Sequence, residues 1–425
     1  MNEAFIQFLW NHKLFKKETF TTFKGERIEI IDPGKWNHDS GPDFFNARIK
    51  IGQVEWAGNV EIHLRSSDWK KHKHHLDPSY DNVILHVVLE NDVETFNSRG
   101  TLIPTVAIRF DTRILQNYEE LVQSKNQIPC STDLFLIEPF HIKYWLGNVL
   151  VERLRDKTLL FEHLLKKSKN NWEESFYQGL ARSFGFKTNS EQFEQLARSL
   201  PNKILLHHKN DLFQIEALLF GQAGLLSRRF FSDNYFTSLQ KEYSFLQKKF
   251  HLKPMAGHLW KFMRMRPLNF PSIRIAQFAS FIYKNEGLFS RIIETRKAED
   301  LKNLFDFQPT VYWETHYRFN KSAEKRSKKM GADARNSVII NTIIPFLFLY
   351  GKEKGLPDYK ERALELLENL PAEKNRIIRK WAKSGIQADN AFYSQSLIQL
   401  TNNYCQKKRC LECEIGNKII SFKNT

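Results

Sequence analysis

Cysteine is scarce in this sequence, with 4 residues among 425, which excludes a fold held together by disulfide bonds. Three of the four lie in the segment YCQKKRCLECEIG near the C-terminus, as Cys405, Cys410 and Cys413. This spacing predicts a soft-metal site, with zinc as the first assignment and Cys130 or a histidine as the fourth ligand. Unligated, reduced thiols are the alternative.

Long hydrophobic runs are also absent. The longest, VIINTIIPFLFLY over 338–350, is interrupted by Asn341 and Pro345 and is shorter than the roughly 20 residues that a membrane span needs. The first segment, MNEAFIQFLWNHKLFKK, contains the acidic Glu3 and no small-residue cleavage site, so we expect an amphipathic helix and not a secretory signal. These features predict a cytoplasmic protein with no membrane partner.

Several catalytic motifs are missing. There is no Gly-x4-Gly-Lys-Ser/Thr loop, no Gly-x-Gly-x-x-Gly after a predicted strand, no His-Glu-x-x-His and no Gly-x-Ser-x-Gly. The sequence therefore gives no support for an ATPase, a dehydrogenase, a zinc protease or a serine hydrolase of these types.

Positive charge is abundant. Lys and Arg number 64 against 48 Asp and Glu, a net charge of +16, and the pI is about 9.5. An excess of this size favours polyanionic partners through long-range attraction and counterion release, so nucleic acid is the first candidate partner.

The hydrophobic pattern predicts two regions and a tail. Residues 1–125 contain short segments rich in Val, Ile and aromatic residues between turns, which predict an α/β domain with a mixed sheet flanked by helices. Its segment VILHVVL, 83–89, is apolar on both faces and predicts a central strand. Residues 126–400 follow a period near 3.6 and predict a mostly helical domain. The cysteine-containing tail, 401–425, is expected to pack back on the junction.

Three polar residues lie at the ends of two predicted strands. Asp43 follows Gly41-Pro42 at the start of one strand, and Glu61 and His63 lie near the end of the next. Successive side chains of a strand alternate faces, so Glu61 and His63 share a face. A hairpin with its turn near Gly52 and Gln53 would return Asp43 towards them.

Two carboxylates on rigid strands suit a hard divalent cation such as Mg²⁺ or Mn²⁺. Such a cation orients a water molecule and offsets the charge that builds up on a phosphoryl group. Ordinary turn chemistry and solvated strand faces are the alternative interpretation of the same residues.

The arrangement of Pro42-Asp43, an intervening strand and Glu61-Ile62-His63 resembles the PD-(D/E)XK nuclease superfamily over about the first 110 residues. The resemblance implies a restriction-endonuclease-like fold and a nuclease site with Asp43, Glu61 and His63 as its catalytic residues. His63 stands where that superfamily usually has lysine. A neutral histidine can ligate a metal or accept a proton, which an ammonium cannot. The resemblance also makes an iron–sulfur cluster an alternative at the four cysteines.

The whole chain also resembles a bacterial family known as domain of unknown function 2851. The phrases GPDFFNARI, WAGNVEIH, SSDW, YDNVILHVV and RCLECEIG carry this resemblance, and it implies no activity.

Five of the 14 histidines lie between residues 63 and 86. The stretch KKHKHH, with His72, His74 and His75, is either an exposed helix end or a source of further metal or phosphate contacts. His86 lies in an apolar strand, where it is either a buried core histidine or a residue supporting the metal site.

The helical region offers basic residues interleaved with aromatic ones in WKFMRMRPLNFPSIRIAQ. Lys261, Arg264, Arg266 and Arg274 are the candidate phosphate contacts, with a solvated helix face as the alternative. Together these features predict a metal-dependent phosphodiesterase that acts on nucleic acid. A nucleic-acid-binding or scaffold protein that kept the fold and lost the chemistry is the alternative.

Overall fold

The computed structural model describes residues 1–16, 20–21, 25–37, 39–227 and 232–422. The chain divides into two compact units. The first consists of Met1–Trp145 with Leu400–Thr425, and the second of Leu146–Gln399. The predicted boundary near residue 125 therefore falls inside the first unit, and the tail belongs to that unit as well.

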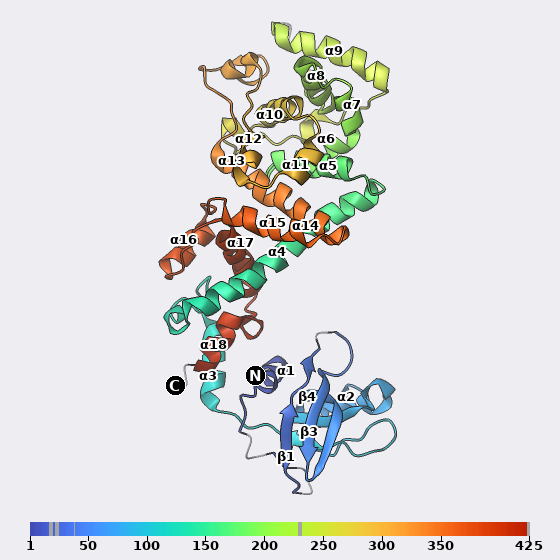
Figure 1. The fold of residues 1–425 in the computed structure, drawn as a ribbon, viewed down its shortest axis with the longest axis vertical. Coiled ribbons are helices and arrows are strands. Elements are labelled where there is room, and N and C mark those ends of the chain that lie inside the picture. The colour runs from blue at the N-terminus through green and yellow to red at the C-terminus, as the bar shows by residue number, and fades with distance from the viewer. Residues whose placement is uncertain (17–19, 22–24, 38, 228–231, 423–425) are drawn as a thin grey trace. The chain divides into compact units, whose positions relative to one another are not determined.

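The first unit combines a sheet with short helices (Figure 1). Its strands are β1 (Ile28–Asp32), β2 (Lys35–Trp36), β3 (Phe44–Ile51), β4 (Val54–Arg65), β5 (Val83–Glu90) and β6 (Thr105–Ala107). Its helices and helical turns are α1 (Glu3–Asn11), α2 (Asp68–Lys71), η2 (His74–Leu76), η3 (Pro78–Tyr80), α3 (Thr112–Gln123), η4 (Leu134–Leu136), the π-helix η9 (Leu400–Cys405), η10 (Cys410–Glu412) and α18 (Glu414–Phe422).

The sheet is mixed, as the sequence predicted. Its order is β1-β3-β4-β5-β6, with β2 also paired to β3. β1, β3 and β4 are antiparallel neighbours, whereas β5 is parallel to β4 and β6 is parallel to β5. Six successive residues of β5, Val83–Val88, are buried, because the alternating pleat sends apolar side chains to both covered faces. α1 and α2 both pack against β4.

The predicted hairpin joins β3 and β4. Ile51 pairs with Val54, and the two-residue turn between them contains Gly52 at φ 58°, a left-handed conformation that glycine adopts without strain. Nearer the site, the pairing shifts by one residue between Phe44 and Ala47. Asn46 lies in this β-bulge with φ 58°.

Segments far apart in the sequence pack together within the first unit. α18 contacts α3 and η4, and the Asn117 side chain of α3 donates a hydrogen bond to the Ile420 carbonyl, at 3.1 Å. The long helix α4 (Pro139–Lys167) begins in this unit and continues into the second.

The second unit is mostly helical. It contains α5 (Trp172–Phe184), α6 (Ser190–Ser199), α7 (Asn202–Leu206), α8 (Leu212–Gln222), α9 (Asn234–Phe250), η5 (Gly257–Leu259), η6 (Pro267–Asn269), α10 (Pro271–Lys284), α11 (Leu288–Glu294), α12 (Ala298–Asn303), η7 (Val311–Thr315), the short strands β7 (His316–Arg318) and β8 (Lys321–Ser322), α13 (Ala332–Val338), the π-helix η8 (Ile339–Ile343), α14 (Ile344–Glu353), α15 (Pro357–Glu368), α16 (Arg376–Lys383) and α17 (Ala391–Gln399).

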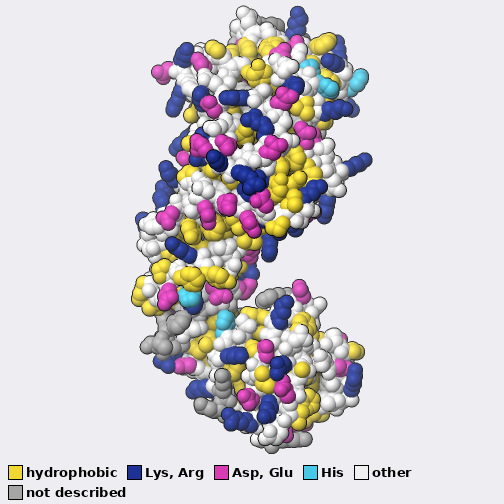
Figure 2. Space-filling view, in the orientation of Figure 1, with side chains coloured by type: hydrophobic (Ala, Val, Ile, Leu, Met, Phe, Trp, Pro, Cys, Tyr) yellow, Lys and Arg dark blue, Asp and Glu magenta, His cyan; other side chains and the backbone are white. Residues whose placement is uncertain are grey.

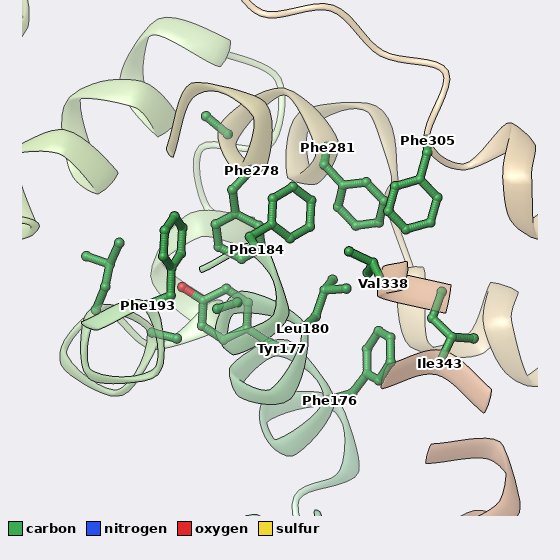
Figure 3. Close-up of a cluster of buried hydrophobic side chains, with 14 of the residues drawn as sticks. Phe176, Tyr177, Leu180, Phe184, Phe193, Phe278, Phe281, Phe305, Val338 and Ile343 are labelled. Atoms are coloured by element: carbon green, nitrogen blue, oxygen red, sulfur yellow. The ribbon is translucent and has the colours of Figure 1, made fainter. Parts of the chain in front are cut away.

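Aromatic side chains fill the core of the helical unit (Figure 3). Phe176, Leu180 and Phe184 project from one face of α5, as their four-residue spacing requires, and all three are buried. The Phe184 ring meets Phe278 of α10 with ring centroids 4.9 Å apart. This four-residue repeat of large apolar side chains therefore marks the inward face of α5.

The longest hydrophobic run forms two consecutive helical segments, η8 and α14. Pro345 lies at the start of α14, directly after the π-helical turn, because proline cannot donate the backbone hydrogen bond of a helix interior. Among the residues that the structure describes, no helix has the length and apolar character needed to cross a membrane.

Candidate metal centre

The carboxylates of Asp43 and Glu61 each accept a backbone N–H from the neighbouring segment, where β3 begins and β4 nears its end. One oxygen of Asp43 accepts the Ile62 N–H at 3.0 Å, and the other accepts from the side-chain amide of Gln7 at 2.8 Å. In return, Glu61 Oε2 accepts the Asp43 N–H at 3.0 Å. These bonds leave Glu61 Oε1 free to face the histidines described below.

The β-bulge brings the two carboxylates to one face of the sheet. Ala47 pairs with Gly58, and an unbroken register would place Asp43 opposite Ile62, whose side chain points away from Glu61. Because of the bulge, Phe44 pairs with Val60, and Asp43 lies opposite Glu61. Directly opposed residues of an antiparallel pair share a face, so the inserted residue creates the site.

Four histidines gather on this face, and we call them the histidine cluster: His63, His72, His74 and His86. His63 follows Glu61 by two residues on β4, and His86 pairs with Glu61 from β5. His63 Nδ1 lies 2.9 Å from His86 Nε2, so one of these nitrogens carries the hydrogen of a buried bond. His72 and His74 come from the turn after α2, where Lys73 adopts a left-handed φ of 65°.

The spacing of the ligand atoms matches a four-coordinate metal site. His63 Nε2 lies 3.1 Å from His72 Nδ1 and 3.6 Å from Glu61 Oε1, and His74 Nε2 lies 3.4 Å from Glu61 Oε1. Nitrogen or oxygen ligands about 2.0–2.1 Å from a tetrahedral ion are roughly 3.3–3.4 Å apart. His63, His72 and His74 each offer one atom within 4.8 Å of the other two. Glu61 and these histidines therefore have the donor atoms and the spacing to hold a divalent cation.

The protonation of the site follows from its burial. Burial, together with the charge of Glu61, raises the pKa of Asp43 to about 7, and burial raises the pKa of Glu61 to about 8. Burial, with His74 and His72 nearby, lowers the pKa of His63 to about 3, so its imidazole is neutral near pH 7. Before a cation binds, imidazole ligands are expected to be neutral. Carboxyl ligands are expected to resist ionisation until the cation supplies a counter-charge.

Three further residues shape this site, and the sequence pattern did not single them out. Gln7 of α1 orients Asp43. The Trp69 ring meets His63, His74 and His86 at centroid distances between 5.2 and 6.4 Å, and the Tyr80 ring stacks on His74 at 3.8 Å. Trp69 belongs to the conspicuous SSDW segment, so its position directly before the histidine-rich stretch was the available signal.

The predicted phosphate contacts separate into two kinds. Lys261, Arg264 and Arg266 are exposed on the segment before η6. Arg274 is buried on α10, where it donates to Asn269 at 2.6 Å and Gln277 at 2.8 Å and lies over the Phe186 ring. The guanidinium of Arg274 is therefore committed to packing within the helical unit.

The four cysteines lie in the first unit and are all buried, with no disulfide among them. Among the described residues, the closely spaced group of candidate metal ligands consists of His63, His72 and His74 and includes no cysteine.

Comparison with known proteins places the chain in a family. The model of a family described as "Protein of unknown function (DUF2851)" matches residues 3–376. The chain belongs to the DUF2851 family. The matched part of this DUF2851 chain contains the sheet, the candidate metal centre and most of the helical unit, and it ends before Cys405. Neither a curated protein nor a solved structure matches the chain. The family description names no activity, so a function has to be argued from the site itself.

Proposed function

We propose that this DUF2851 protein is a metal-dependent phosphodiesterase that acts on nucleic acid. The observation that carries the proposal is the convergence of the buried Glu61 carboxylate, the half-buried Asp43 carboxylate and three closely spaced histidines on one face of the sheet. The position of Asp43 directly before β3, with Glu61 and His63 on β4, also agrees with the resemblance to the PD-(D/E)XK superfamily.

The donor atoms favour a cation that accepts both nitrogen and oxygen. Imidazole suits Zn²⁺ and other first-row transition metals, whereas carboxylates also suit Mg²⁺ and Mn²⁺. Glu61, His63 and His74 supply such a mixed set, so Mn²⁺ and Zn²⁺ fit this site better than Mg²⁺ does. When bound, the cation would supply a water of lowered pKa and offset charge on the phosphoryl oxygens.

The protein residues have distinct tasks in this proposal. Glu61 holds the cation through Oε1 while its Oε2 remains fixed to the Asp43 backbone. Asp43, oriented by Gln7 and Ile62, presents the second carboxylate. As a neutral imidazole, His63 either ligates the cation or orients the attacking water. The contact with His86 fixes which His63 nitrogen carries the hydrogen.

The polyanion would be attracted by basic side chains outside the metal centre. On the face drawn in Figure 2, Lys and Arg side chains are interspersed with Asp and Glu and do not form one continuous patch. Among the predicted phosphate contacts, Lys261, Arg264 and Arg266 are exposed, and we assign the contacts to them. Arg274 is buried, so we leave it out of the phosphate-binding set. Contacts of this kind supply affinity without reading sequence.

The experiment compares cleavage of fluorescent single-stranded and double-stranded DNA and RNA after chelation and re-addition of Mg²⁺, Mn²⁺ or Zn²⁺. Cleavage should require a divalent cation. Glu61→Gln and Asp43→Asn should each lower the rate by at least about 100-fold, since metal-assisted stabilisation of the transition state amounts to several kcal/mol. Both replacements keep the side-chain shape, so they test the charge.

Glu55→Gln provides the matched control. Glu55 lies on the same strand, is exposed and pairs with Arg48 at 2.7 Å, and its replacement makes the same charge change away from the site. Cleavage by the control should equal that of the parent protein. Cleavage that persists in both site variants, or without any divalent cation, would refute the assignment.

The alternative is a nucleic-acid-binding protein without chemistry, and it is favoured by His63 at the position where the superfamily usually has lysine. Such a protein would bind nucleic acid with an affinity that falls steeply as salt rises, yet release no product with any of the three cations. The same oligonucleotides, measured by fluorescence anisotropy, distinguish this outcome from catalysis.

A further inference from the structure

A cavity of about 590 Å³ opens in the helical unit, and we call it the Arg318 cavity. Its walls come from the residues after α8, from η5 and the chain that follows it, from the start of α10, and from β7 with the turn after it. The lining combines aromatic and polar side chains, among them Trp260, Phe262, Phe319, His258, Ser272 and Arg318. A volume within about 300–1,000 Å³ and a lining of this mixed kind are typical of sites for small organic groups.

The wall of the Arg318 cavity is held in place by a close approach of two backbone segments. A Cβ atom on Gly224, whose φ is 70°, would lie 2.1 Å from the Met255 carbonyl oxygen. A Cβ atom on Gly257 would lie 2.4 Å from the Gly224 carbonyl oxygen, so both positions need glycine. The Trp260 indole N–H donates to the Ala223 carbonyl at 2.8 Å. The wall is therefore formed before any ligand arrives, which lowers the entropy cost of binding.

Arg318 presents an unpaired guanidinium at this cavity. The guanidinium lies over the rings of Phe262 and Phe270, 4.5 and 4.6 Å from their centroids. The side chain is exposed, and within the described part of the chain no hydrogen bond or ion pair engages it. Stacking on the two rings fixes the plane of the guanidinium and leaves the N–H groups at its edge free. This is the geometry that binds two oxygens of a phosphate.

The loop between the two phenylalanines adds positive charge. Phe262 and Phe270 contact each other with ring centroids 5.5 Å apart, so the loop begins and ends beside Arg318. Three exposed basic side chains lie on or next to this loop, and among the described residues none of them forms an ion pair: Lys261, Arg264 and Arg266. Since consecutive Cα atoms are about 3.8 Å apart, the Cα atom of Arg264 lies at most about 7.6 Å from that of Phe262.

The acidic side chains of the segments that flank β7 already have partners. Asp233 accepts hydrogen bonds from the Tyr312 hydroxyl and from the Asn320 N–H. Glu314 pairs with Lys325 at 3.3 Å. These carboxylates therefore do not neutralise Arg318, and its charge is available to an anionic ligand.

We propose that the Arg318 cavity binds one unpaired nucleotide of a single-stranded nucleic acid. Arg318 holds the phosphate, the aromatic wall packs against the base, and the exposed side chains of the neighbouring loop contact the adjacent phosphates. A base inside a duplex remains stacked between its neighbours and does not enter such a cavity. The kind of ligand rests on the proposed function, and the cavity narrows the substrate of that function to single strands.

The test measures binding of short fluorescent oligothymidylate and oligouridylate by anisotropy, with the full-length protein as isolated and no added cation. Arg318→Gln should weaken binding of the tighter strand at least about 10-fold, as expected for the loss of charge-assisted hydrogen bonds. The slope of log affinity against log salt should also fall by about 0.7, the value for one phosphate contact on a single strand. Arg318→Lys should keep this slope and still lose affinity, because an ammonium neither stacks nor pairs through two parallel hydrogen bonds.

Arg379→Gln provides the matched control. Arg379 is exposed on α16, away from α8 and α10 in Figure 1, and its replacement makes the same charge change. The control should bind strands as the parent protein does. Parental affinity and slope in Arg318→Gln, or an equal loss in Arg379→Gln, would refute the site. A duplex or thymidine monophosphate bound as tightly as the strand would refute an unpaired nucleotide of a strand as the ligand.

Failure of this proposal can be told apart from failure of the proposed function. If no cation supports cleavage but Arg318→Gln still weakens binding, the cavity assignment stands and the phosphodiesterase assignment falls. If cleavage depends on Glu61 while Arg318→Gln binds strands as the parent protein does, the phosphodiesterase assignment stands and the cavity assignment falls.

Discussion

A buried carboxyl group in the helical unit makes the stability of that unit depend on pH in a defined direction. Glu216 of α8 is fully buried, and its carboxylate accepts hydrogen bonds from the hydroxyls of Tyr235 and Thr310. Burial outweighs these bonds and raises its pKa from 4.5 to about 7. Glu216 is therefore largely protonated in the folded protein at pH 6 and ionised in the unfolded chain.

The size of the effect follows from linkage. Between pH 4.5 and 7 the folded state binds more protons at this position than the unfolded state does, so stability falls as pH rises through this window. A difference of about 2.5 pKa units corresponds to roughly 3 kcal/mol at 1.36 kcal/mol per unit. At about 2–4 °C per kcal/mol for a domain of this size, the melting temperature should fall by roughly 6–12 °C from this group alone.

The measurement is the melting temperature of the parent protein and of Glu216→Gln between pH 4.5 and 8. The amide does not titrate, so the difference between the two melting temperatures should shift in favour of the variant as pH rises to 7 and then level off. Glu191→Gln, which removes an exposed carboxylate of α6, serves as the control for the change in net charge. Parallel curves for the parent protein and Glu216→Gln would refute the reasoning.

Two further predictions test packing. Gly58→Ala should destabilise the first unit by about 1–3 kcal/mol, since its Cβ would lie 2.4 Å from Ile84 Cγ2 and 2.7 Å from the Asn82 carbonyl oxygen; an unchanged urea midpoint would contradict the close approach. Phe184→Ala should cost the helical unit about 3–5 kcal/mol because it empties a fully buried ring position. The exposed Phe245→Ala should cost far less, and equal losses for the two variants would argue against the described core.

Much of the sheet could be predicted because short-range patterns determine it. The two-residue turn at Gly52 and the period of two made the β3–β4 hairpin predictable. Those same rules, applied without interruption, would place Asp43 opposite Ile62 and away from Glu61. The bulge at Asn46 instead places Asp43 opposite Glu61. A periodic sequence pattern cannot predict this bulge, because a bulge is a local departure from the period.

The histidines illustrate a second limit. The segment KKHKHH has no periodicity that separates inward from outward side chains, so an exposed helix end was a reasonable interpretation. The left-handed residue Lys73 ends α2 and turns His74 inward, while His72 stays exposed with its ring nitrogen near His63. Arg274 shows the reverse case, in which a basic residue of a basic segment packs inward on an aromatic ring.

The domain boundary depended on information that local sequence does not contain. Residues 126–145 were assigned to the helical region because they follow the loss of strand pattern, yet they pack with the sheet-containing unit. The return of residues 400–422 to that unit involves contacts between residues more than 250 positions apart in the sequence. The cysteine spacing was the sequence feature that pointed to it, through the expectation of a shared ligand set.

The pairing of α3 with α18 has a consequence for synthesis of the chain. A ribosome makes the sheet before α18, with the whole of Leu146–Gln399 emerging between them. The helical unit is continuous in sequence, whereas the surface of α3 that receives Ile420 has to wait until this intervening unit and α18 have been made. Completion of the first unit therefore follows synthesis of the helical unit.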